Sequence, residues 1–350
     1  MYKNLTLLGI STLVSLVALE FALRLIMPER LAFVPILQNN ALTYVPHQQQ
    51  RARHLEWDYV IDVNADGFRN DRNLEDIPDR TILALGDSFT EGYGVSLEKS
   101  FPKQFEDVLA VANPDIHVYN AGHAGTGIPY YRLVYREIFK HDRRIDRVLI
   151  AFYVGNDLLH TDALPNGNLR PGNEYGNAWT YKLKVFLGTR VALYAVANWI
   201  IKSNPAFDGM CKKLGACDEP PPPVIYRESI AENAIPKTLA HLISFVNEIR
   251  ADGRQAVVLI IPTREQIDNR QWQRVVEEFG KEVQSRRLII NRGLTEGLKN
   301  SGIDVLDLTD VARKQESKNP GTLYFEHDGH WTEVGHVMAA AALSELNSLK

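Results

Sequence analysis

The chain has 350 residues, of which 45% are hydrophobic, and a formal net charge of -4 with a pI near 6.2. A chain of this length can bury one sizeable core together with an additional segment. The net charge is slightly negative, so the chain lacks the positive charge that attracts nucleic acids, and nucleic-acid-binding functions are not expected.

The amino-terminal residues 5–27 form an apolar stretch that is long enough to cross a bilayer once as a helix. Glu20 and Arg24 stand four positions apart, so they can pair on one helix face or extend towards the membrane interface. A cleaved signal peptide is the competing interpretation. No small-x-small cleavage site follows the apolar run, and we therefore predict an uncleaved transmembrane anchor over residues 1–28. Basic residues flank both ends almost equally, so they do not fix the orientation.

Residues 29–80 show little hydrophobic periodicity and many turn-forming residues, which predicts an irregular lead-in rather than a domain. The aliphatic and β-branched run 81–85 then predicts a buried strand that stops at Gly86-Asp87-Ser88. A tight turn there would raise the Ser88 hydroxyl to the carboxyl edge of a sheet, where open α/β folds bind their ligands. Ser88 is therefore our candidate nucleophile, although the same tripeptide is often an ordinary turn.

Strands and helices alternate along most of the remaining chain. Further strands are expected at 116–119, 148–154, 256–261 and 303–308, and helices at 101–112, 127–141, 231–251 and from 332 onwards. This alternation predicts an α/β domain over residues 81–350, with three layers and a parallel sheet covered by helices on both faces. Polar motifs follow three of these strands, namely Asn120-Ala121-Gly122, Gly155-Asn156-Asp157 and Pro262-Thr263-Arg264.

Residues 161–230 interrupt this alternation, and we predict that they form an insertion. They are rich in Gly, Asn and Pro and contain the two cysteines of the chain, Cys211 and Cys217. The cysteines can form a disulfide in an oxidising compartment or can be two unrelated thiols. The apolar stretch 191–201 is too short to cross a bilayer, which leaves a helix packed on the main core, a lid, or a patch that contacts a membrane.

Residues 324–336 combine several histidines with several carboxylates. Glu326, His327, Asp328 and His330 are all competent metal ligands. A catalytic zinc, however, generally takes ligands held on regular elements, and the rest of the chain supplies no clear one, so we expect no metal. The preferred interpretation is a base for the serine, because a nucleophilic hydroxyl needs an imidazole and the imidazole needs a carboxylate.

Four blocks of this chain resemble the motifs of the SGNH (GDSL-like) hydrolases. They are Gly86-Asp87-Ser88 with Thr90 and Gly92, Asn120-Ala121-Gly122, Asn156-Asp157, and Asp328 with His330. The resemblance extends from about residue 81 to residue 336 and implies the flavodoxin-like fold of that family, here preceded by one transmembrane helix. Two positions depart from the family pattern: Val154 stands where a glycine is usual, and Asp328-x-His330 replaces the usual Asp-x-x-His.

The resemblance implies a serine esterase that works through an acyl-serine intermediate and needs no cofactor. Ser88 would be the nucleophile, His330 the general base and then acid, and Asp328 the residue that orients the imidazole. The oxyanion hole would consist of the backbone N–H groups of Ser88 and Gly122 and the side-chain amide of Asn156. Asp328 is the least certain of these assignments, because some members use a Ser-His dyad.

Other polar residues are expected to have supporting roles. Arg264 can contact an anionic or sugar substrate, or form a surface salt bridge. His327 and His336 are expected to be structural or surface groups. Asp87 is expected to stabilise the turn.

Membrane-tethered members of the family suggest removal of acyl groups, acetyl above all, from an envelope or extracellular carbohydrate or lipid. The same site could instead pass the acyl group to a sugar, as a polysaccharide O-acetyltransferase within a polysaccharide-modification machinery. A non-catalytic carbohydrate-binding or assembly protein is a third possibility, against which the intact Ser88, Asn156 and His330 argue. The cysteine pair and the resemblance together favour a single-pass membrane protein with most of the chain outside the cytoplasm, periplasmic in a bacterium.

Overall fold

The computed structural model describes residues 2–26, 43–47, 49–53, 56–158, 187, 191–194, 196–197, 224–226, 228–326 and 328–349. The chain divides into two compact units. The first draws on Met1–Leu37, Gln50–Val60 and Gly172–Pro220, and the second on Gln38–Gln49, Ile61–Pro171 and Pro221–Lys350. The two predicted cysteine partners, Cys211 and Cys217, lie outside the described residues, as does His327.

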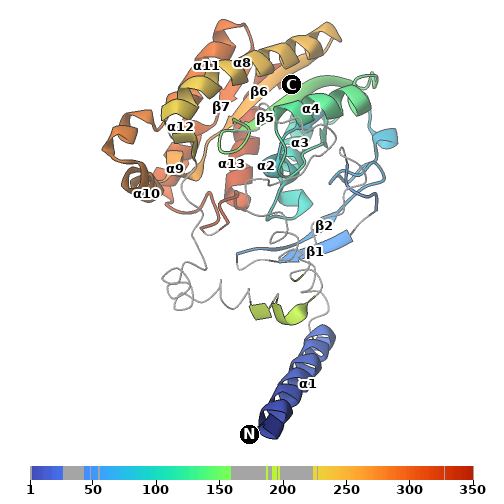
Figure 1. Ribbon diagram of the computed structural model, residues 1–350. Coiled ribbons are helices and arrows are strands. Elements are labelled where there is room, and N and C mark those ends of the chain that lie inside the picture. Colours follow the sequence, from blue (N-terminus) through green and yellow to red (C-terminus); the bar gives the residue numbers. More distant parts are fainter. Residues whose placement is uncertain are drawn as a thin grey trace. The chain divides into compact units, whose positions relative to one another are not determined.

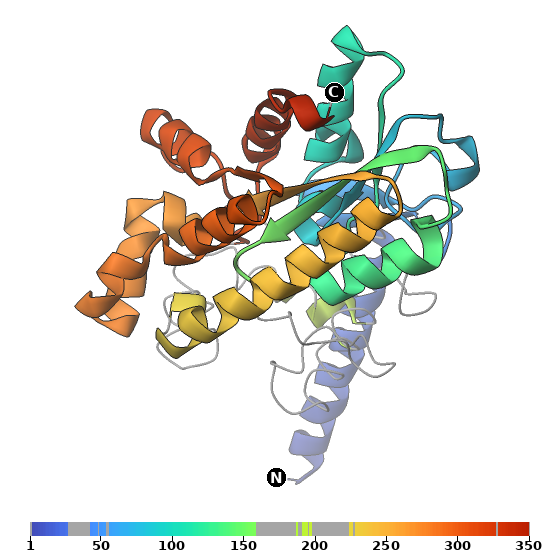
Figure 2. The same ribbon diagram turned by 90° about the horizontal axis from the view of Figure 1, so that it is seen from above.

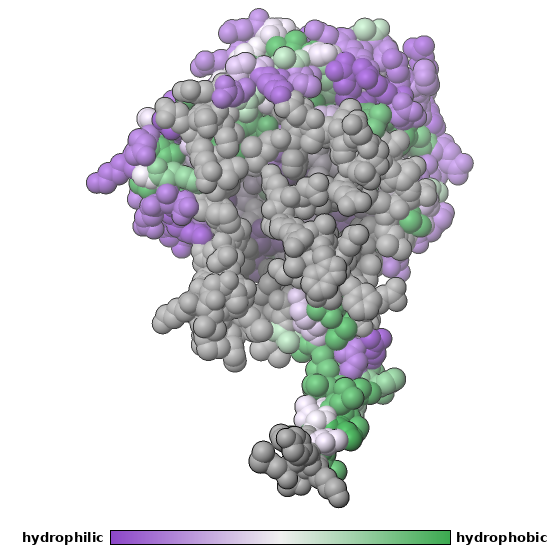
Figure 3. All heavy atoms as spheres, viewed as in Figure 1, coloured by the Kyte–Doolittle hydropathy of each residue, from purple (hydrophilic) through white to green (hydrophobic). Residues whose placement is uncertain are grey.

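Helix α1 (Tyr2–Ile26) is the main element of the first unit. Its segment Thr6–Leu25 has a mean hydropathy of 2.0 and none of it is buried, so that its surface is largely apolar in Figure 3. By length and composition this helix can cross a membrane, although a signal sequence shares these features. The structure thus contains the apolar amino-terminal helix that the sequence predicts.

The lead-in contains regular structure that its sequence did not predict. Strands β1 (Gln49–Arg53) and β2 (Asp58–Asp62) form a two-stranded sheet. Alternate residues of β2 are buried, the period that a half-buried strand requires. The alternation is only five residues long, which is too short to stand out among the neighbouring turn residues.

A five-stranded sheet with the order β4-β3-β5-β6-β7 is the centre of the second unit. Its strands are β3 (Thr81–Leu85), β4 (His117–Asn120), β5 (Ile145–Tyr153), β6 (Gln255–Ile261) and β7 (Asp304–Asp307). All four neighbouring pairs are parallel. The predicted parallel α/β sheet is therefore confirmed, and the ends of its strands differ from the predicted bounds by three residues at most.

Helices cover both faces of this sheet (Figures 1 and 2). Leu83 and Leu85 of β3 pack into one apolar cluster, while Ile82 and Ala84 pack into another on the opposite face, as the two-residue period of a strand requires. The first cluster includes residues of α4 (Ile128–Val134), α8 (Glu228–Ala251) and α11 (Ile289–Asn300). The second includes residues of α3 (Phe101–Ala112), α12 (Thr309–Lys318) and α13 (Glu333–Ser344). The fold is thus the predicted three-layer α/β/α arrangement.

The remaining helices of this unit are short or lie beside the sheet. They are α2 (Ser88–Glu91), α9 (Arg264–Ile267) and α10 (Asn269–Phe279). The helix predicted at 127–141 is divided, because a π-helical turn over Tyr135–Phe139 continues α4.

Part of the lead-in packs into the core of the second unit. Phe68 and Arg69 are fully buried. Arg69 donates from Nη1 to the carbonyl oxygens of Glu91 and Gly92, at 3.0 and 2.5 Å, and from Nη2 to that of Val95 at 2.5 Å. These carbonyls lie at and just beyond the carboxyl end of α2, where a helix leaves oxygens unsatisfied and a positive charge is stabilising. Arg69 therefore fixes the end of the short helix that begins with Ser88.

Candidate active site

Ser88 begins α2 immediately after β3 ends, which places its hydroxyl at the carboxyl edge of the sheet. Asp87 caps this helix, since its Oδ1 accepts a hydrogen bond from the Phe89 amide at 3.0 Å. Gly92 ends the helix in the left-handed conformation, with φ 86°, so the turn is only four residues long. The strand, the cap and the glycine together produce the sharp turn that places the serine hydroxyl at the edge of the sheet.

His330 faces Ser88 from the loop between α12 and α13. Its Nε2 lies 2.8 Å from Ser88 Oγ, and its Nδ1 lies 2.6 Å from Asp328 Oδ1. Since a carboxylate can only accept, Nδ1 carries the hydrogen and Nε2 accepts from the serine hydroxyl. This is the arrangement in which a serine can lose its proton to an imidazole while a carboxylate stabilises the cation that forms.

The shortened spacing between Asp328 and His330 is accommodated by the glycine between them. Gly329 has φ 84°, a conformation that L-residues with a side chain rarely adopt. The turn brings the Asp328 carboxylate within hydrogen-bonding distance of two groups of His330. These are its backbone N–H, at 3.2 Å, and its imidazole. The loop folds back on itself, because the Phe325 amide donates a hydrogen bond to the His330 carbonyl oxygen at 2.8 Å. The loss of one residue from the usual spacing is therefore compatible with a Ser-His-Asp geometry.

Arg264, which the sequence suggested as a substrate contact, lies against this same loop. Its Nη1 donates to the carbonyl oxygens of Phe325, at 3.3 Å, and Glu326. The guanidinium thus braces the backbone that carries Asp328 and His330. This geometry supports a positioning role for Arg264, and the contact with substrate stays a prediction.

The three residues expected to form the oxyanion hole lie around Ser88, but two of their donors have acceptors within the protein. The Gly122 amide donates to Asn120 Oδ1 at 2.9 Å, and Asn156 Nδ2 donates to Asp87 Oδ2 at 3.1 Å. The Ser88 amide belongs to the first turn of α2, where an N–H group has no acceptor within the helix. Of the three expected donors, Ser88 N–H and the second hydrogen of the Asn156 amide are therefore the best placed to meet an oxyanion.

Gly122 is required for a reason that the sequence did not reveal. A Cβ at this position would lie 2.3 Å from the Glu91 amide nitrogen and 2.6 Å from the Thr90 carbonyl carbon. The glycine therefore allows the loop after β4 to touch the backbone of α2. Glu91 reinforces this contact, because its Oε2 accepts from the Ala124 amide and from the Tyr44 hydroxyl, each at 2.7 Å.

Two buried carboxyl groups lie behind the nucleophile. Burial raises the pKa of Asp87 to about 6, against the opposing effects of the Phe89 amide, His330 and Asn156. Burial and the negative charge of Asp87 raise the pKa of Asp157, whose two oxygens lie 3.0 Å from the Tyr131 hydroxyl. Sequence reasoning assigned Asp87 only to the turn and missed its contact with Asn156, for which no local signal exists.

Aromatic rings flank the imidazole, which sequence reasoning also missed. The ring centroids of Tyr93 and Phe89 lie 4.5 and 5.1 Å from that of His330. Phe89 lies within the Gly86–Gly92 motif and Tyr93 directly follows it, and their spacing around the α2 turn was the available signal. His336, in contrast, is structural: it is buried, its Nδ1 accepts from the Phe101 amide at 3.1 Å, and burial lowers its pKa to about 3.

A model of the GDSL-like lipase/acylhydrolase family matches residues 84–338. The chain belongs to this family. As a GDSL-like acylhydrolase it is a serine enzyme that hydrolyses esters, and the family supplies the triad and oxyanion-hole chemistry to which the geometry around Ser88 corresponds.

Solved structures of other proteins are similar to this acylhydrolase at low sequence identity. The acetylxylan esterase Axe2 from Geobacillus stearothermophilus is 13% identical, with 78% of this chain and 98% of that chain covered and a TM-score of 0.44. TesA is also 13% identical, with 75% and 95% covered and a TM-score of 0.42. No curated protein sequence matches the chain.

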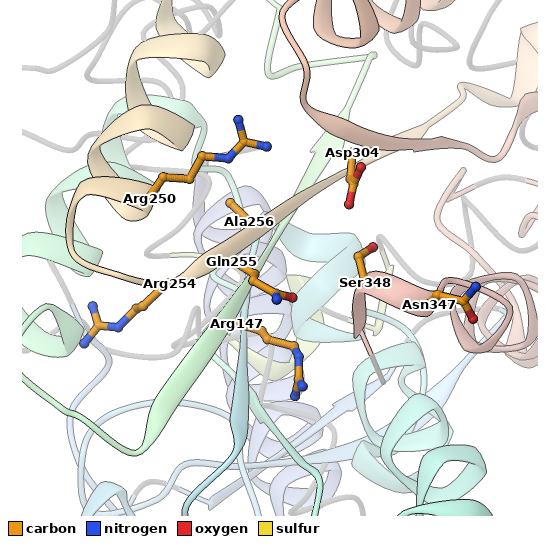
Figure 4. Close-up of a pocket in the computed structure, with 8 residues that line it drawn as sticks. All are labelled: Arg147, Arg250, Arg254, Gln255, Ala256, Asp304, Asn347 and Ser348. Carbon is orange, nitrogen blue, oxygen red and sulfur yellow. The ribbon is translucent and has the colours of Figure 1, made fainter.

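A cavity of the acylhydrolase lies at the edge of the sheet opposite to the one that carries Ser88. It measures about 400 Å³ and is lined by residues near the amino ends of β5, β6 and β7, among them Arg147, Arg250, Arg254 and Asp304. In Figure 4 the guanidinium groups of Arg250 and Arg254 point away from each other. Arg254 uses its donors on the carbonyl oxygens of Ile145, Phe139, Lys140 and Asp142 and on the Tyr135 hydroxyl. This cavity therefore lies at the opposite end of the strands from Ser88, and its charged side chains do not converge on a common point.

Proposed function

We propose that this acylhydrolase removes acetyl groups from an envelope or extracellular carbohydrate or lipid, and that Ser88, His330 and Asp328 carry out the reaction. The observation that carries the proposal is the continuous hydrogen-bonded sequence from Ser88 Oγ to His330 Nε2, at 2.8 Å, and from His330 Nδ1 to Asp328, at 2.6 Å. The preference for acetyl groups and carbohydrates rests on the resemblance to membrane-tethered members of the family.

In the proposed mechanism the Ser88 oxygen attacks the ester carbonyl while His330 takes the hydroxyl proton. Asp328 stabilises the imidazolium that forms, and the Ser88 amide and the Asn156 amide stabilise the oxyanion. His330 then returns the proton to the departing alcohol, which leaves an acyl-serine. Water attacks this ester with His330 again as base, which releases the acid and restores the serine.

The proposed setting is a membrane surface on the outer side of the cytoplasmic membrane. It is supported by the apolar length of α1. Protease added to cells with an opened outer barrier should degrade the second unit, and complete protection of that unit would contradict the proposed orientation.

The activity is tested with the full-length protein in detergent micelles, using p-nitrophenyl acetate, p-nitrophenyl butyrate and an acetylated sugar. We expect acetate to be released faster than butyrate, and Ser88→Ala to reduce turnover by about a thousandfold or more. An unchanged rate in Ser88→Ala would contradict the assignment of the nucleophile. Transfer to an added sugar in preference to water, through the same serine, would replace the hydrolase proposal by the O-acetyltransferase alternative.

A further inference from the structure

Glu20 is an ionisable residue within the apolar helix α1, and residues of the insertion bind its carboxylate. Its Oε1 accepts from the Ala192 amide and its Oε2 from the Leu193 amide, both at 2.9 Å. Arg24, one turn further along α1, donates from Nε to Oε1 at 2.9 Å. With donors on both oxygens, the Glu20 side chain is only 19% exposed.

The position of Glu20 along α1 sets the depth of this contact. It lies six residues before the last residue of the helix, Ile26, which corresponds to about 9 Å at the rise of an α-helix. The 25 residues of α1 extend about 38 Å, somewhat more than the roughly 30 Å hydrocarbon core of a bilayer. In a membrane-spanning α1, Glu20 therefore lies close to the boundary between hydrocarbon and headgroups.

A carboxylate at that depth has few water molecules to solvate it. Ionisable residues in membrane-spanning helices are costly and generally pair with other groups or serve a function. Two backbone N–H groups and one guanidinium satisfy Glu20 here, and undocking of residues 192 and 193 would leave Arg24 as the remaining one of these three partners. The contact thus gives a reason for an acidic residue in a largely apolar helix.

The insertion residues around the Glu20 contact have a composition that is typical of the boundary between hydrocarbon and headgroups. Residues 191–197 have the sequence VALYAVA, which is apolar except for one tyrosine, Tyr194. Tyrosine is enriched at membrane interfaces, where its ring and its hydroxyl find different surroundings. Apolar segments of this kind bind at the boundary of headgroups and acyl chains.

We propose that residues 191–194 and 196–197 form a membrane-surface contact, docked on α1 through Glu20, and that their partner is the lipid bilayer at headgroup depth. The inference requires that α1 crosses a membrane, and it is independent of the ester chemistry. The alternative occupant of this apolar segment is the core of the catalytic domain, as the sequence also allowed.

The depth of residue 196 tests the proposal. The full-length protein is placed in phosphatidylcholine nanodiscs with a nitroxide at the 5-position of the acyl chain, and a fluorescent amino acid replaces Val196. The matched control carries the same probe at Val111, a valine of α3 that is 89% exposed. We expect quenching at position 196 to exceed that at position 111 severalfold. Equal quenching at the two positions would overturn the proposal.

Glu20 variants test the docking contact itself. Glu20→Gln keeps one acceptor oxygen and Glu20→Leu keeps none. Each charge-assisted hydrogen bond lost should lower the ratio of docked to undocked segment about tenfold, so quenching at position 196 should fall in Glu20→Gln and further in Glu20→Leu. A probe at Leu8 of α1 should stay quenched in every variant, which shows that the anchor remains inserted.

Quenching at position 196 that is unchanged in Glu20→Leu would overturn the role of Glu20. Hydrolysis of p-nitrophenyl acetate is measured on the same nanodiscs. The quenching assay measures the depth of the probe and is independent of ester hydrolysis. A sample that is docked on the membrane but inactive would contradict only the proposed function. A sample that is active but not docked would contradict only this inference.

Discussion

Asp87 Oδ2 accepts a hydrogen bond from Asn156 Nδ2 across 3.1 Å, so the residue before the nucleophile holds an amide that follows the neighbouring strand β5. Asp87 is also fully buried, and this burial raises its pKa from 3.8 to about 6. The titratable groups that interact with it include His330, Glu91 and Asp157, together with the tyrosines Tyr131 and Tyr153. The site therefore contains a buried charge that forms near pH 6.

Asp87 should make the stability of the protein depend on pH. Between pH 3.8 and about pH 6 the folded state keeps a proton that the unfolded state releases, so this contribution to the unfolding free energy falls as the pH rises. The difference between the two pKa values corresponds to about 3 kcal/mol. Relative to wild type, Asp87→Asn should therefore gain up to about 3 kcal/mol between pH 4 and pH 7. Denaturant titrations at both pH values measure this gain, and a difference that is independent of pH would contradict it.

Asp328 should be essential to turnover although its spacing from His330 is unusual. In Asp328→Asn an amide replaces the acceptor of the Nδ1 hydrogen, which favours the tautomer that cannot accept the Ser88 proton. We expect kcat to fall by about 10,000-fold with little change in KM. Glu333→Gln, at an exposed carboxylate near the same loop, is the control and should be unaffected. A loss smaller than about tenfold in Asp328→Asn would indicate a Ser-His dyad instead.

Gly122→Ala should damage both stability and activity. The new methyl group would lie 2.3 Å from the Glu91 amide nitrogen, so the loop and α2 must move apart. We expect a loss of about 1–3 kcal/mol of stability, as in overpacked cores, together with a lower kcat. Gly293→Ala is the matched control: it lies in α11, where the new Cβ would lie 3.2 Å from the γ2 methyl group of Ile235, so a small shift accommodates it and the loss should be much smaller than for Gly122→Ala. Thermal unfolding and ester hydrolysis by the two variants decide the matter.

The variant Arg264→Lys distinguishes two roles for Arg264, positioning of the loop that carries His330 and contact with the substrate. An ammonium cannot reproduce the planar fork that reaches the carbonyl oxygens of Phe325 and Glu326. If Arg264 positions the loop, kcat should fall about tenfold while KM stays unchanged. A higher KM with unchanged kcat would instead restore the substrate role. Arg270→Lys, at an exposed guanidinium paired with Asp268, serves as the control.

The sheet and the triad could be predicted because their signals are local. The run 81–85 is apolar on both faces, and a buried parallel strand requires this. Ser88 and His330 could be recognised because each lies in a short motif with a chemical requirement for that residue type. The order of the motifs along the chain then placed them at one edge of the sheet.

What the sequence did not predict depends on contacts between distant segments. The clash that makes Gly122 necessary involves Glu91, 31 positions away, and the amide held by Asp87 comes from Asn156. Neither contact leaves a periodic pattern, because each depends on how two loops pack after the sheet has formed. The packing of the lead-in could not be predicted for the same reason: Arg69 has no hydrophobic periodicity around it, yet its partners are carbonyl groups at the end of α2.

The packing of Tyr44 and Arg69 has a consequence for where the folding unit begins. The region shared with the family starts at residue 84, but a chain that starts there would lack both side chains. Helix α2 would lose the cation at its carboxyl end, and the buried Glu91 carboxylate would lose its phenolic donor. A helix of four residues has almost no stability of its own. We therefore expect the smallest form of this enzyme that folds on its own to be larger than the region matched by the family and to include Tyr44.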